Sequence, residues 1–210
     1  MTMPKHESYT VRIEGVTRHL PLFAVSPQLR IAVFNLLGDT EITIAAARGL
    51  AKKLAKTQAD VLVTAEAKSI PLAYHLAVEM SKPYVVLRKE YKPYMGSALS
   101  VETLSITTGK PQTLYLDEKD QSLLRGKRVI VVDDVISTGS TLQGMRLLMD
   151  KAGAHIVAEA AVFTEGERAQ WGHIIALGHL PLFTGDEKKE KPKKSVKKKT
   201  SAKPSAASAG

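Results

Sequence analysis

Residues 128–141 constrain this chain more than any other stretch of it. They read Arg-Val-Ile-Val-Val-Asp-Asp-Val-Ile-Ser-Thr-Gly-Ser-Thr. Val129 to Val132 are apolar and β-branched, which is typical of a strand covered on both faces of a parallel sheet. Asp133 and Asp134 then stand at the carboxyl end of that strand, where open α/β sheets bind their ligands. A parallel α/β fold with a ligand site at this edge is therefore predicted.

The loop after the acids has the composition of an anion-binding turn. Gly139 can take a backbone conformation closed to bulkier residues, and Ser140 or Thr141 is placed to cap the next helix. Backbone N–H groups, the helix dipole and the hydroxyls, including those of Ser137 and Thr138, all favour a phosphate. The two neighbouring carboxylates suit sugar hydroxyls or a divalent metal. The stretch predicts a phosphate and sugar site.

The simplest alternative is a polar turn whose hydroxyls only cap a helix. The order of the complete motif favours a ligand site over that alternative. The glycine is not followed by the Lys of a Walker A loop, and the chain has no G-x-G-x-x-G. Nucleotide hydrolysis and dinucleotide binding therefore lose support.

At these residues the chain resembles the type I phosphoribosyltransferases, whose hallmark is a strand, two acids and a Thr-Gly loop that bind 5-phosphoribosyl-1-diphosphate (PRPP). The resemblance implies that Asp133 and Asp134 hold the ribose hydroxyls and contact Mg²⁺ through water or ribose. It implies that Ser137, Thr138, Gly139, Ser140 and Thr141 hold the 5-phosphate. It also implies a single-domain fold in which a small hood subdomain accompanies the sheet.

A second loop, containing Glu66, Ala67 and Lys68, also lies between a predicted strand end and a helix start. Its N–H groups are expected to face the same crevice as the acid pair. In the family this loop binds pyrophosphate, often through a cis peptide, here implied between Glu66 and Ala67. Lys68 stands where adenine-type members have Arg, so it keeps the charge but loses the bidentate fork.

A third cationic segment begins at Arg88, with Lys89 and Lys92 at an Arg-Lys-x-x-Lys spacing. A solvated charge cluster is the alternative interpretation. The spacing resembles the adenine-type enzymes, where these residues reach the diphosphate, and we expect Lys89 to take part in catalysis. The segment 105–110 lacks the acid and phenol that adenine-type members carry there, for which Glu102 or Tyr94 are possible substitutes. Its Ser-x-Thr character is closer to the xanthine-type relatives, so the identity of the base stays open.

Composition sets the frame for these sites. The chain has 210 residues and 22.8 kDa, enough for one α/β domain. No apolar stretch is long enough to cross a bilayer, no signal peptide is apparent, and there is no cysteine, so we expect a cytoplasmic protein. Residues 186–210 hold nine Lys and three acids, and so +6 of the net +9. We expect this tail to be disordered, either as a solubilising extension or as a loose contact with nucleic acid.

The pattern along the chain predicts alternating strands and helices in residues 1–185. Strands are expected at 9–13, 20–25, 31–37, 60–64, 83–87, 112–116, 129–132, 155–163 and 173–177. Helices are expected from Asp39 or Thr40 to about Lys56, over Ile70 to Met80, and after the acid pair up to Gly153. Residues 88–111 are predicted as a long loop that closes over the site. The pentapeptide His-Leu-Pro-Leu-Phe occurs at 19–23 and 179–183, which suggests a hood built from residues 1–38 and 164–185.

Together these features predict a purine phosphoribosyltransferase, most consistent with adenine as the base, acting with Mg²⁺ and PRPP. Phe23, Val25 and Phe34 are the expected base pocket, and a homodimer is expected by analogy with the family. A xanthine- or hypoxanthine-type enzyme is one alternative, and a PRPP-sensing regulator of transcription is another. A PRPP synthetase is disfavoured because the chain offers no second nucleotide site.

Overall fold

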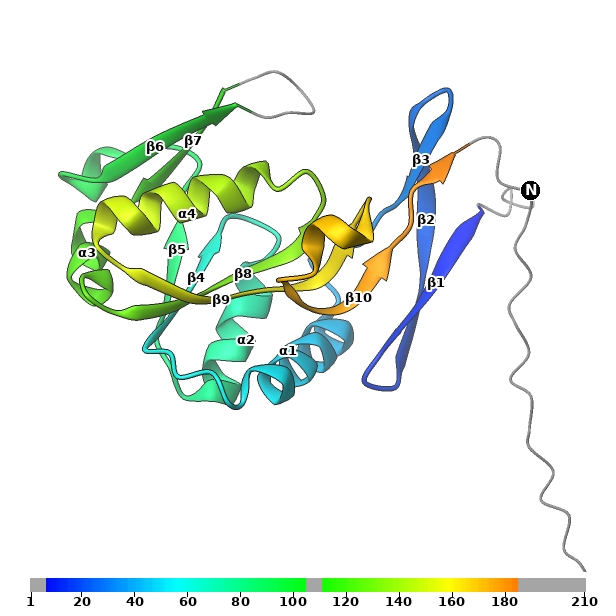
Figure 1. The fold of residues 1–210 in the computed structure, drawn as a ribbon, viewed down its shortest axis with the longest axis horizontal. Coiled ribbons are helices and arrows are strands. Elements are labelled where there is room, and N and C mark those ends of the chain that lie inside the picture. The colour runs from blue at the N-terminus through cyan, green and yellow to red at the C-terminus, as the bar shows by residue number, and fades with distance from the viewer. Residues whose placement is uncertain (1–6, 105–110, 185–210) are drawn as a thin grey trace, which may run out of the picture.

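The computed structural model describes residues 7–104 and 111–184. Its centre is a parallel sheet of five strands in the order β10-β9-β8-β4-β5 (Figure 1). The strands are β4 (Val61–Ala65), β5 (Tyr84–Leu87), β8 (Arg128–Ile136), β9 (His155–Glu165) and β10 (Ile175–Leu180). All four neighbouring pairs are parallel, so the predicted α/β architecture is confirmed.

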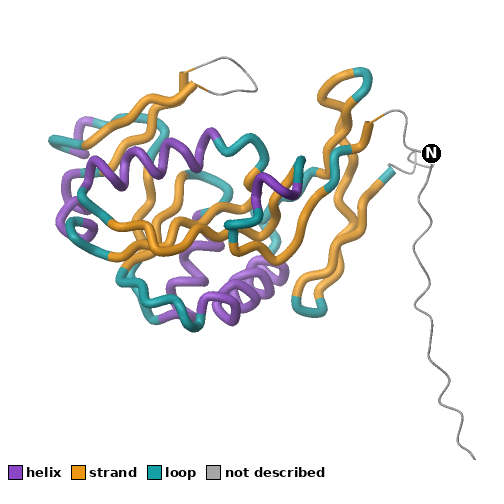
Figure 2. Tube along the Cα trace, in the orientation of Figure 1, coloured by secondary structure: helices purple, strands orange, loops and turns teal. Residues whose placement is uncertain are grey.

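Helices cover both faces of this sheet (Figures 1 and 2). Helices α1 (Thr40–Leu54) and α2 (Ile70–Met80) lie on one face, and α4 (Ser140–Ala152) lies on the other with α3 (Glu118–Leu124) beside it. Alternate residues of β8 enter opposite cores, Ile130 with α1 and α2, Val131 with α4. The continuous apolar run at 129–132 is explained by this two-sided burial.

Capping residues set the helix ends that the sequence predicted. Asp39 caps α1, because its Oδ1 accepts a hydrogen bond from the N–H of Ile42 at 3.2 Å. The guanidinium of Arg18 holds the same carboxylate through two hydrogen bonds of 2.7 and 2.8 Å. These bonds outweigh the effect of burial and hold the pKa of Asp39 below its ordinary value. At the C-terminal end of α4, Gly153 closes the helix with a left-handed φ of 71°.

A second, four-stranded antiparallel sheet forms the hood, in the order β1-β2-β3-β11. Its strands are β1 (Ser8–Ile13), β2 (Val16–Ser26), β3 (Leu29–Ala32) and β11 (Phe183–Thr184). Figure 2 shows it beside the central body as an element made of strands. Phe183 pairs with Arg30, and its ring packs edge-on against Tyr9 at 5.6 Å. The hood is thus assembled from both chain ends, as predicted.

Two predicted boundaries in this region are wrong. The hood range 164–185 is too long, because β10 belongs to the central sheet and only β11 joins the hood from that side. The second His-Leu-Pro-Leu-Phe copy therefore crosses from one sheet to the other. The strand expected at 31–37 ends at Ala32, and the chain then turns toward α1.

Part of the predicted long loop at 88–111 forms regular structure. It contains the 3-10 turn η1 (Pro93–Met95) and strand β6 (Leu99–Leu104), which pairs with β7 (Pro111–Leu116) as an antiparallel hairpin. The hairpin packs on α4 at Gly144, where an added Cβ would meet Leu114 at 2.9 Å. The amide of Arg88 donates to the Tyr115 carbonyl at 2.9 Å and joins the hairpin to the sheet edge. The sequence pattern did not reveal helix α3. The carboxylate of Glu118, at the start of this helix, accepts a hydrogen bond from the Ser97 N–H at 2.7 Å.

The described part of the chain contains no helix with the length and apolar character needed to cross a bilayer. The Lys-rich tail at 186–210 and the segment 105–110 lie outside the described residues. The predictions made for them stay predictions.

Replacing Phe34 by Ala is expected to destabilise the fold by about 3 to 5 kcal/mol, since its buried ring packs edge-on against Phe163 at 4.8 Å. Phe23→Ala is the matched control, because that ring is 61% exposed and its loss should cost less than about 0.5 kcal/mol. Urea unfolding followed by circular dichroism measures both. Equal stability of the two variants would contradict the assignment of Phe34 to the core.

Candidate functional site

The site opens where β8 parts from β4 at the carboxyl edge of the sheet. β8 pairs with β4 only as far as Val131, whereas it pairs with β9 as far as Ile136. Asp133 and Asp134 lie in the part of β8 that has lost its β4 neighbour. Because the two strands separate there, side chains from the loops after β4 and β8 meet across the gap.

The loop after β8 encloses a small cavity of about 150 Å³, lined by Asp133 and by residues 135–142. Gly139 has a φ of 78° and is itself the N-cap of α4. The prediction that Ser140 or Thr141 caps this helix is wrong, since both lie inside its first turn. A glycine cap offers no side-chain acceptor, so the first N–H groups of α4 are available to an anion. The hydroxyls of Thr138 and Ser140 lie 3.2 Å apart at the same loop.

The loop after β4 forms one wall of a larger cavity of about 540 Å³. Its lining residues are Ala65, Glu66, Ala67, Lys68, Ser69, Lys89, Asp133, Asp134, Val135 and Thr141. The peptide between Glu66 and Ala67 is cis, as the resemblance implied. The two cavities share Asp133, Val135 and Thr141, so they form one continuous binding surface with the acid pair at its middle.

Two buried hydroxyls fix the start of this loop. The Thr64 hydroxyl donates to the carbonyl of Val132 on β8 at 2.8 Å. The Ser69 hydroxyl donates to the carbonyl of Ala65 at 2.9 Å, which closes the loop on its own strand. Ser69 is only 2% exposed. Neither residue was among the predicted site residues, although Ser69 stands directly before α2.

Glu66 joins this loop to the segment after β5. Its carboxylate accepts a hydrogen bond from the Arg88 guanidinium at 2.7 Å and another from the Lys89 backbone N–H at 2.6 Å. Burial opposes ionisation of Glu66, but these donors hold the pKa of its carboxyl below the ordinary value. The same contact raises the pKa of Arg88. Glu66 therefore fixes the backbone from which the Lys89 side chain enters the larger cavity.

The three cations after β5 consequently have different surroundings. Lys89 lines the cavity with Lys68, as predicted. Arg88 is paired with Glu66, and the Lys92 ammonium lies 2.8 Å from Glu90. Neither Arg88 nor Lys92 lines the cavity, and their contact with a diphosphate stays a prediction.

The acid pair is held in an electrostatically costly arrangement. Asp133 Oδ1 accepts the backbone N–H of Asp134 at 2.9 Å. Burial and the adjacent Asp134 carboxylate raise the pKa of Asp133 to about 8, while the nearby Lys89 charge opposes the rise. A ligand whose hydroxyls donate hydrogen bonds to the two carboxylates, or a ligand that carries positive charge, would relieve this repulsion. No cluster of three metal-ligating side chains occurs among residues 7–104 and 111–184. A divalent ion here would therefore draw most of its ligands from substrate and water.

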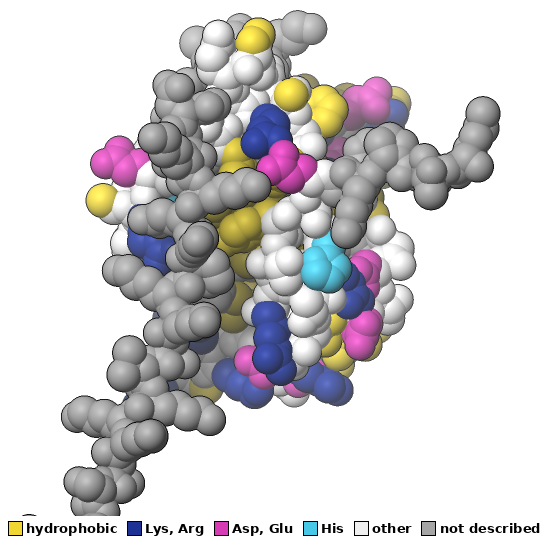
Figure 3. Space-filling view, turned by 90° about the vertical axis from the view of Figure 1, so that its right-hand side faces the viewer, with side chains coloured by type: hydrophobic (Ala, Val, Ile, Leu, Met, Phe, Trp, Pro, Cys, Tyr) yellow, Lys and Arg dark blue, Asp and Glu magenta, His cyan; other side chains and the backbone are white. Residues whose placement is uncertain are grey.

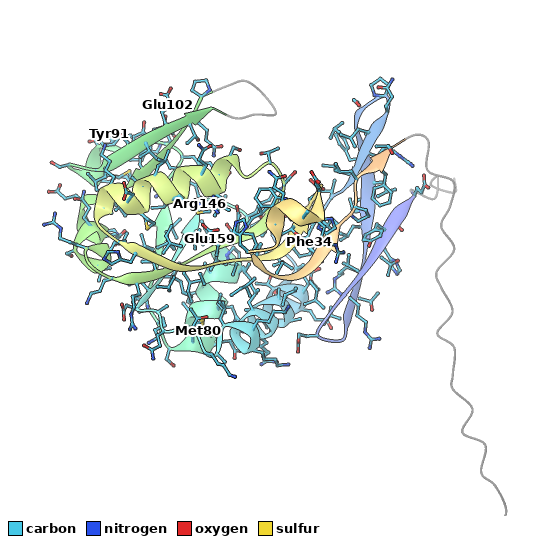
Figure 4. The ribbon with its side chains drawn as sticks, in the orientation of Figure 1. Phe34, Met80, Tyr91, Glu102, Arg146 and Glu159 are labelled. Carbon is cyan, nitrogen blue, oxygen red and sulfur yellow. The ribbon has the colours of Figure 1, made fainter. Side chains whose placement is uncertain are left out.

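The three residues predicted for the base pocket differ in exposure. Phe34 is buried at 4% exposure among core residues at the junction of hood and body (Figure 4), so it offers no open surface to a base. Its place in the pocket is corrected to a place in the core. Phe23 and Val25 are exposed on β2. Figure 3, which views the hood end, shows exposed hydrophobic side chains among charged ones on this part of the molecule.

The expected substitutes for the missing acid and phenol lie on the hairpin arm. Glu102 is exposed on β6, and Tyr94 is 71% exposed in η1. Neither lines one of the two cavities. Residues 105–110, with the Ser-x-Thr pattern, lie outside the described residues.

Comparison with known proteins agrees with this geometry. The family model of the phosphoribosyl transferase domain matches residues 36–174. The chain is 38% identical over 118 residues to a hypoxanthine/guanine phosphoribosyltransferase of Methanothrix soehngenii, covering 56% of this chain and 59% of that protein. It is 32% identical over 133 residues to the purine biosynthesis transcriptional repressor PurR of Bacillus subtilis, covering 63% and 46%. The chain spans about half the length of these curated relatives.

Solved structures with the same fold include two adenine phosphoribosyltransferases. The enzyme of Thermoanaerobacter pseudethanolicus has a TM-score of 0.59 at 22% identity, covering 82% of this chain and 95% of that one. The enzyme of Trypanosoma brucei has a TM-score of 0.59 at 16% identity, covering 91% and 97%. At these identities the likeness shows the fold. With the family model extending from residue 36, before α1, to residue 174, beyond the 137–141 loop, this chain belongs to the phosphoribosyl transferase family.

Proposed function

We propose that this protein transfers the 5-phosphoribosyl group from PRPP to a purine base, giving a nucleoside monophosphate and pyrophosphate. The observation that carries the proposal is the pair of cavities that meet at Asp133, Val135 and Thr141. One is small and rich in hydroxyls and helix N–H groups, and the other contains two lysines. PRPP has a single phosphate at one end and a diphosphate at the other, which matches this division.

The small cavity is assigned to the 5-phosphate. The N-terminus of α4 and the hydroxyls of Ser137 through Thr141 supply donors, and no carboxylate other than Asp133 lines it. Asp133 and Asp134 then receive the ribose hydroxyls as hydrogen-bond donors. This contact explains why two acids stand side by side despite their mutual repulsion.

The larger cavity is assigned to the diphosphate, beside Lys68 and Lys89. As the bond at the anomeric carbon breaks, negative charge accumulates on the departing pyrophosphate, and these ammonium groups stabilise it. Glu66 acts through Lys89, whose backbone it fixes, and Arg88 acts through Glu66. A purine nitrogen attacks the anomeric carbon directly, so no covalent nucleophile from the protein is required.

Mg²⁺ fits this site as part of the substrate complex. The raised pKa of Asp133 marks a place where positive charge is favourable, and Asp133 and Asp134 are the residues that would hold the ion, through water or the ribose. When bound, Mg²⁺ would supply positive charge to the leaving diphosphate.

The identity of the purine base is a separate part of the proposal. The Arg88-Lys89-x-x-Lys92 spacing favours adenine, whereas the relatives at 34–38% identity bear the names of hypoxanthine/guanine enzymes. We place the base beside the hood, near Phe23 and Val25. A cytoplasmic homodimer remains our expectation for the assembled protein.

A second candidate function is regulation of transcription, because repressor and activator proteins of purine biosynthesis are among the relatives at 31–32% identity. Such a protein would bind PRPP without turning it over. A helix-turn-helix is not found in the described segment before α1, where residues 8–32 form β1 to β3. That segment therefore offers no recognition helix for a major groove.

Incubation of the full-length protein with Mg²⁺, PRPP and each of adenine, hypoxanthine, guanine, xanthine and uracil is expected to give a nucleoside monophosphate from at least one purine. Chromatography of the nucleotides and release of pyrophosphate measure the product. Omitting PRPP is the control. PRPP binding by calorimetry, with no product from any base and a gel shift on DNA, would instead establish the regulator.

Asp134→Asn is expected to lower kcat by about 100-fold or more, because the amide loses the charge that orients the ribose. Far-UV circular dichroism and the melting temperature should stay close to those of the wild type. Asp150→Asn, on the exposed side of α4, is the matched control and should keep full activity. Full activity in Asp134→Asn would remove that residue from the mechanism.

Asp133→Asn is expected to stabilise the unliganded protein at pH 8 and to have a smaller effect at pH 5. The folded protein holds the Asp133 proton more tightly than the unfolded chain, so wild-type stability falls as the pH rises from about 4 to about 8. The Asp133→Asn variant does not lose stability in this way as the pH rises. Near pH 8 its free energy of unfolding should therefore exceed that of the wild type by about 1 kcal/mol or more, which is about 2 to 4 °C in Tm. Thermal melts at both pH values test it. A gain that is the same at both would show that repulsion is not its cause.

A further inference from the structure

Trp171 packs directly on the phosphate loop. A Cβ added to Gly139 would lie 2.7 Å from Cη2 and 3.4 Å from Cζ3 of the indole. The ring edge therefore occupies the space beside the one loop residue that has a left-handed φ. Any larger residue at 139 would collide with the ring as well as strain the backbone.

The indole is itself held in place. Trp171 ends the 3-10 turn η2 (Arg168–Trp171) and is 7% exposed. Its Nε1–H donates to the carbonyl of Glu165, at the end of β9, at 2.9 Å. It shares a hydrophobic cluster with Ile136 and Leu142, which flank the loop on β8 and α4. The ring is thus fixed to the sheet on one side and touches the loop on the other.

His179 on β10 in addition holds the turn after β9. His179 Nε2 lies 3.0 Å from the carbonyl of Gly166, and Nδ1 lies 2.9 Å from the Thr164 hydroxyl. Because a carbonyl only accepts, Nε2 carries the proton, and Nδ1 accepts from Thr164. His179 begins the second His-Leu-Pro-Leu-Phe copy, which continues into hood strand β11.

We propose that Trp171 is a positioning residue for the 5-phosphate, holding the 137–141 loop in its anion-binding form, and that His179 supports it through the turn at 164–166. This inference rests on the proposed function, because it assigns the ligand of that loop. It adds a residue from outside the motif, which reaches the site through η2. The ring acts on the backbone of Gly139 and does not itself bind phosphate, since its only polar atom is bonded to Glu165.

Ribose 5-phosphate is the probe, because it carries the 5-phosphate and the ribose hydroxyls without the diphosphate. By calorimetry, Trp171→Ala is expected to raise its Kd about tenfold, which corresponds to about 1.4 kcal/mol of binding free energy. Trp171→Phe keeps a flat ring against Gly139 and should restore most of the affinity. In the transfer assay, Trp171→Ala should raise the KM for PRPP and leave the KM for the base unchanged.

His179→Ala should raise the Kd for ribose 5-phosphate several-fold. His19→Ala is its matched control, because His19 begins the first copy of the same pentapeptide and also contacts a threonine, Thr10, at 2.9 Å, but within the hood. It should bind ribose 5-phosphate as the wild type does. Circular dichroism and thermal melts confirm that each variant is folded.

Trp171 is the single tryptophan of the chain, so tryptophan fluorescence reports on the surroundings of this residue alone. A saturable change in emission is expected as ribose 5-phosphate binds to the wild type. Unchanged affinity in folded Trp171→Ala, or a defect confined to the KM for the base, would overturn the inference while leaving the proposed function intact. A wild type that neither binds ribose 5-phosphate nor forms product would overturn both.

Discussion

The separation of β8 from β4 after Val131 is the constraint on which the site depends. A parallel sheet satisfies its backbone groups by pairing, and both strands are covered on their two faces where they pair with each other, at Val61–Val63 and Val129–Val131. Where the pairing stops, the Thr64 hydroxyl donates a hydrogen bond to the Val132 carbonyl. Beyond this point the segments that follow β4 and β8 form two loops that face each other. The acid pair, the cations and the glycine-capped helix all follow from that opening.

The surroundings of the acids show a site built for a ligand and not for stability. Asp133 is half-buried beside another carboxylate, and desolvation and repulsion together raise its pKa to about 8. Elsewhere the described acids behave differently: Asp39 and Glu66 have guanidinium partners, and the pKa of each is lowered. The contrast between carboxylates with and without a guanidinium partner is what motivates the proposal that Asp133 and Asp134 receive a substrate.

Sequence reasoning was strongest where a local pattern has one physical solution. The β-branched run at 129–132 predicted a doubly covered strand, and a glycine flanked by hydroxyls predicted the loop that precedes α4. It failed where the outcome depends on a distant partner. The charge of Arg88 is visible in the sequence, but its pairing with Glu66 is not, because the two residues follow different strands, β5 and β4. Phe34 similarly reads as a pocket residue until Phe163 is placed against it.

The sequence by itself determined the α/β class and the positions of the acid pair and of the 137–141 loop, since each rests on residues adjacent in the chain, whereas the cis peptide was implied only by the family resemblance. Only the tertiary structure decided which cations enter the cavity, that residues 99–104 form a strand of a packed hairpin, and that Trp171 lies on Gly139. Contacts between segments far apart in sequence are set by how the layers pack. The physical reason is that burial and ion pairing depend on distance in space, whereas local conformation depends on neighbours along the chain.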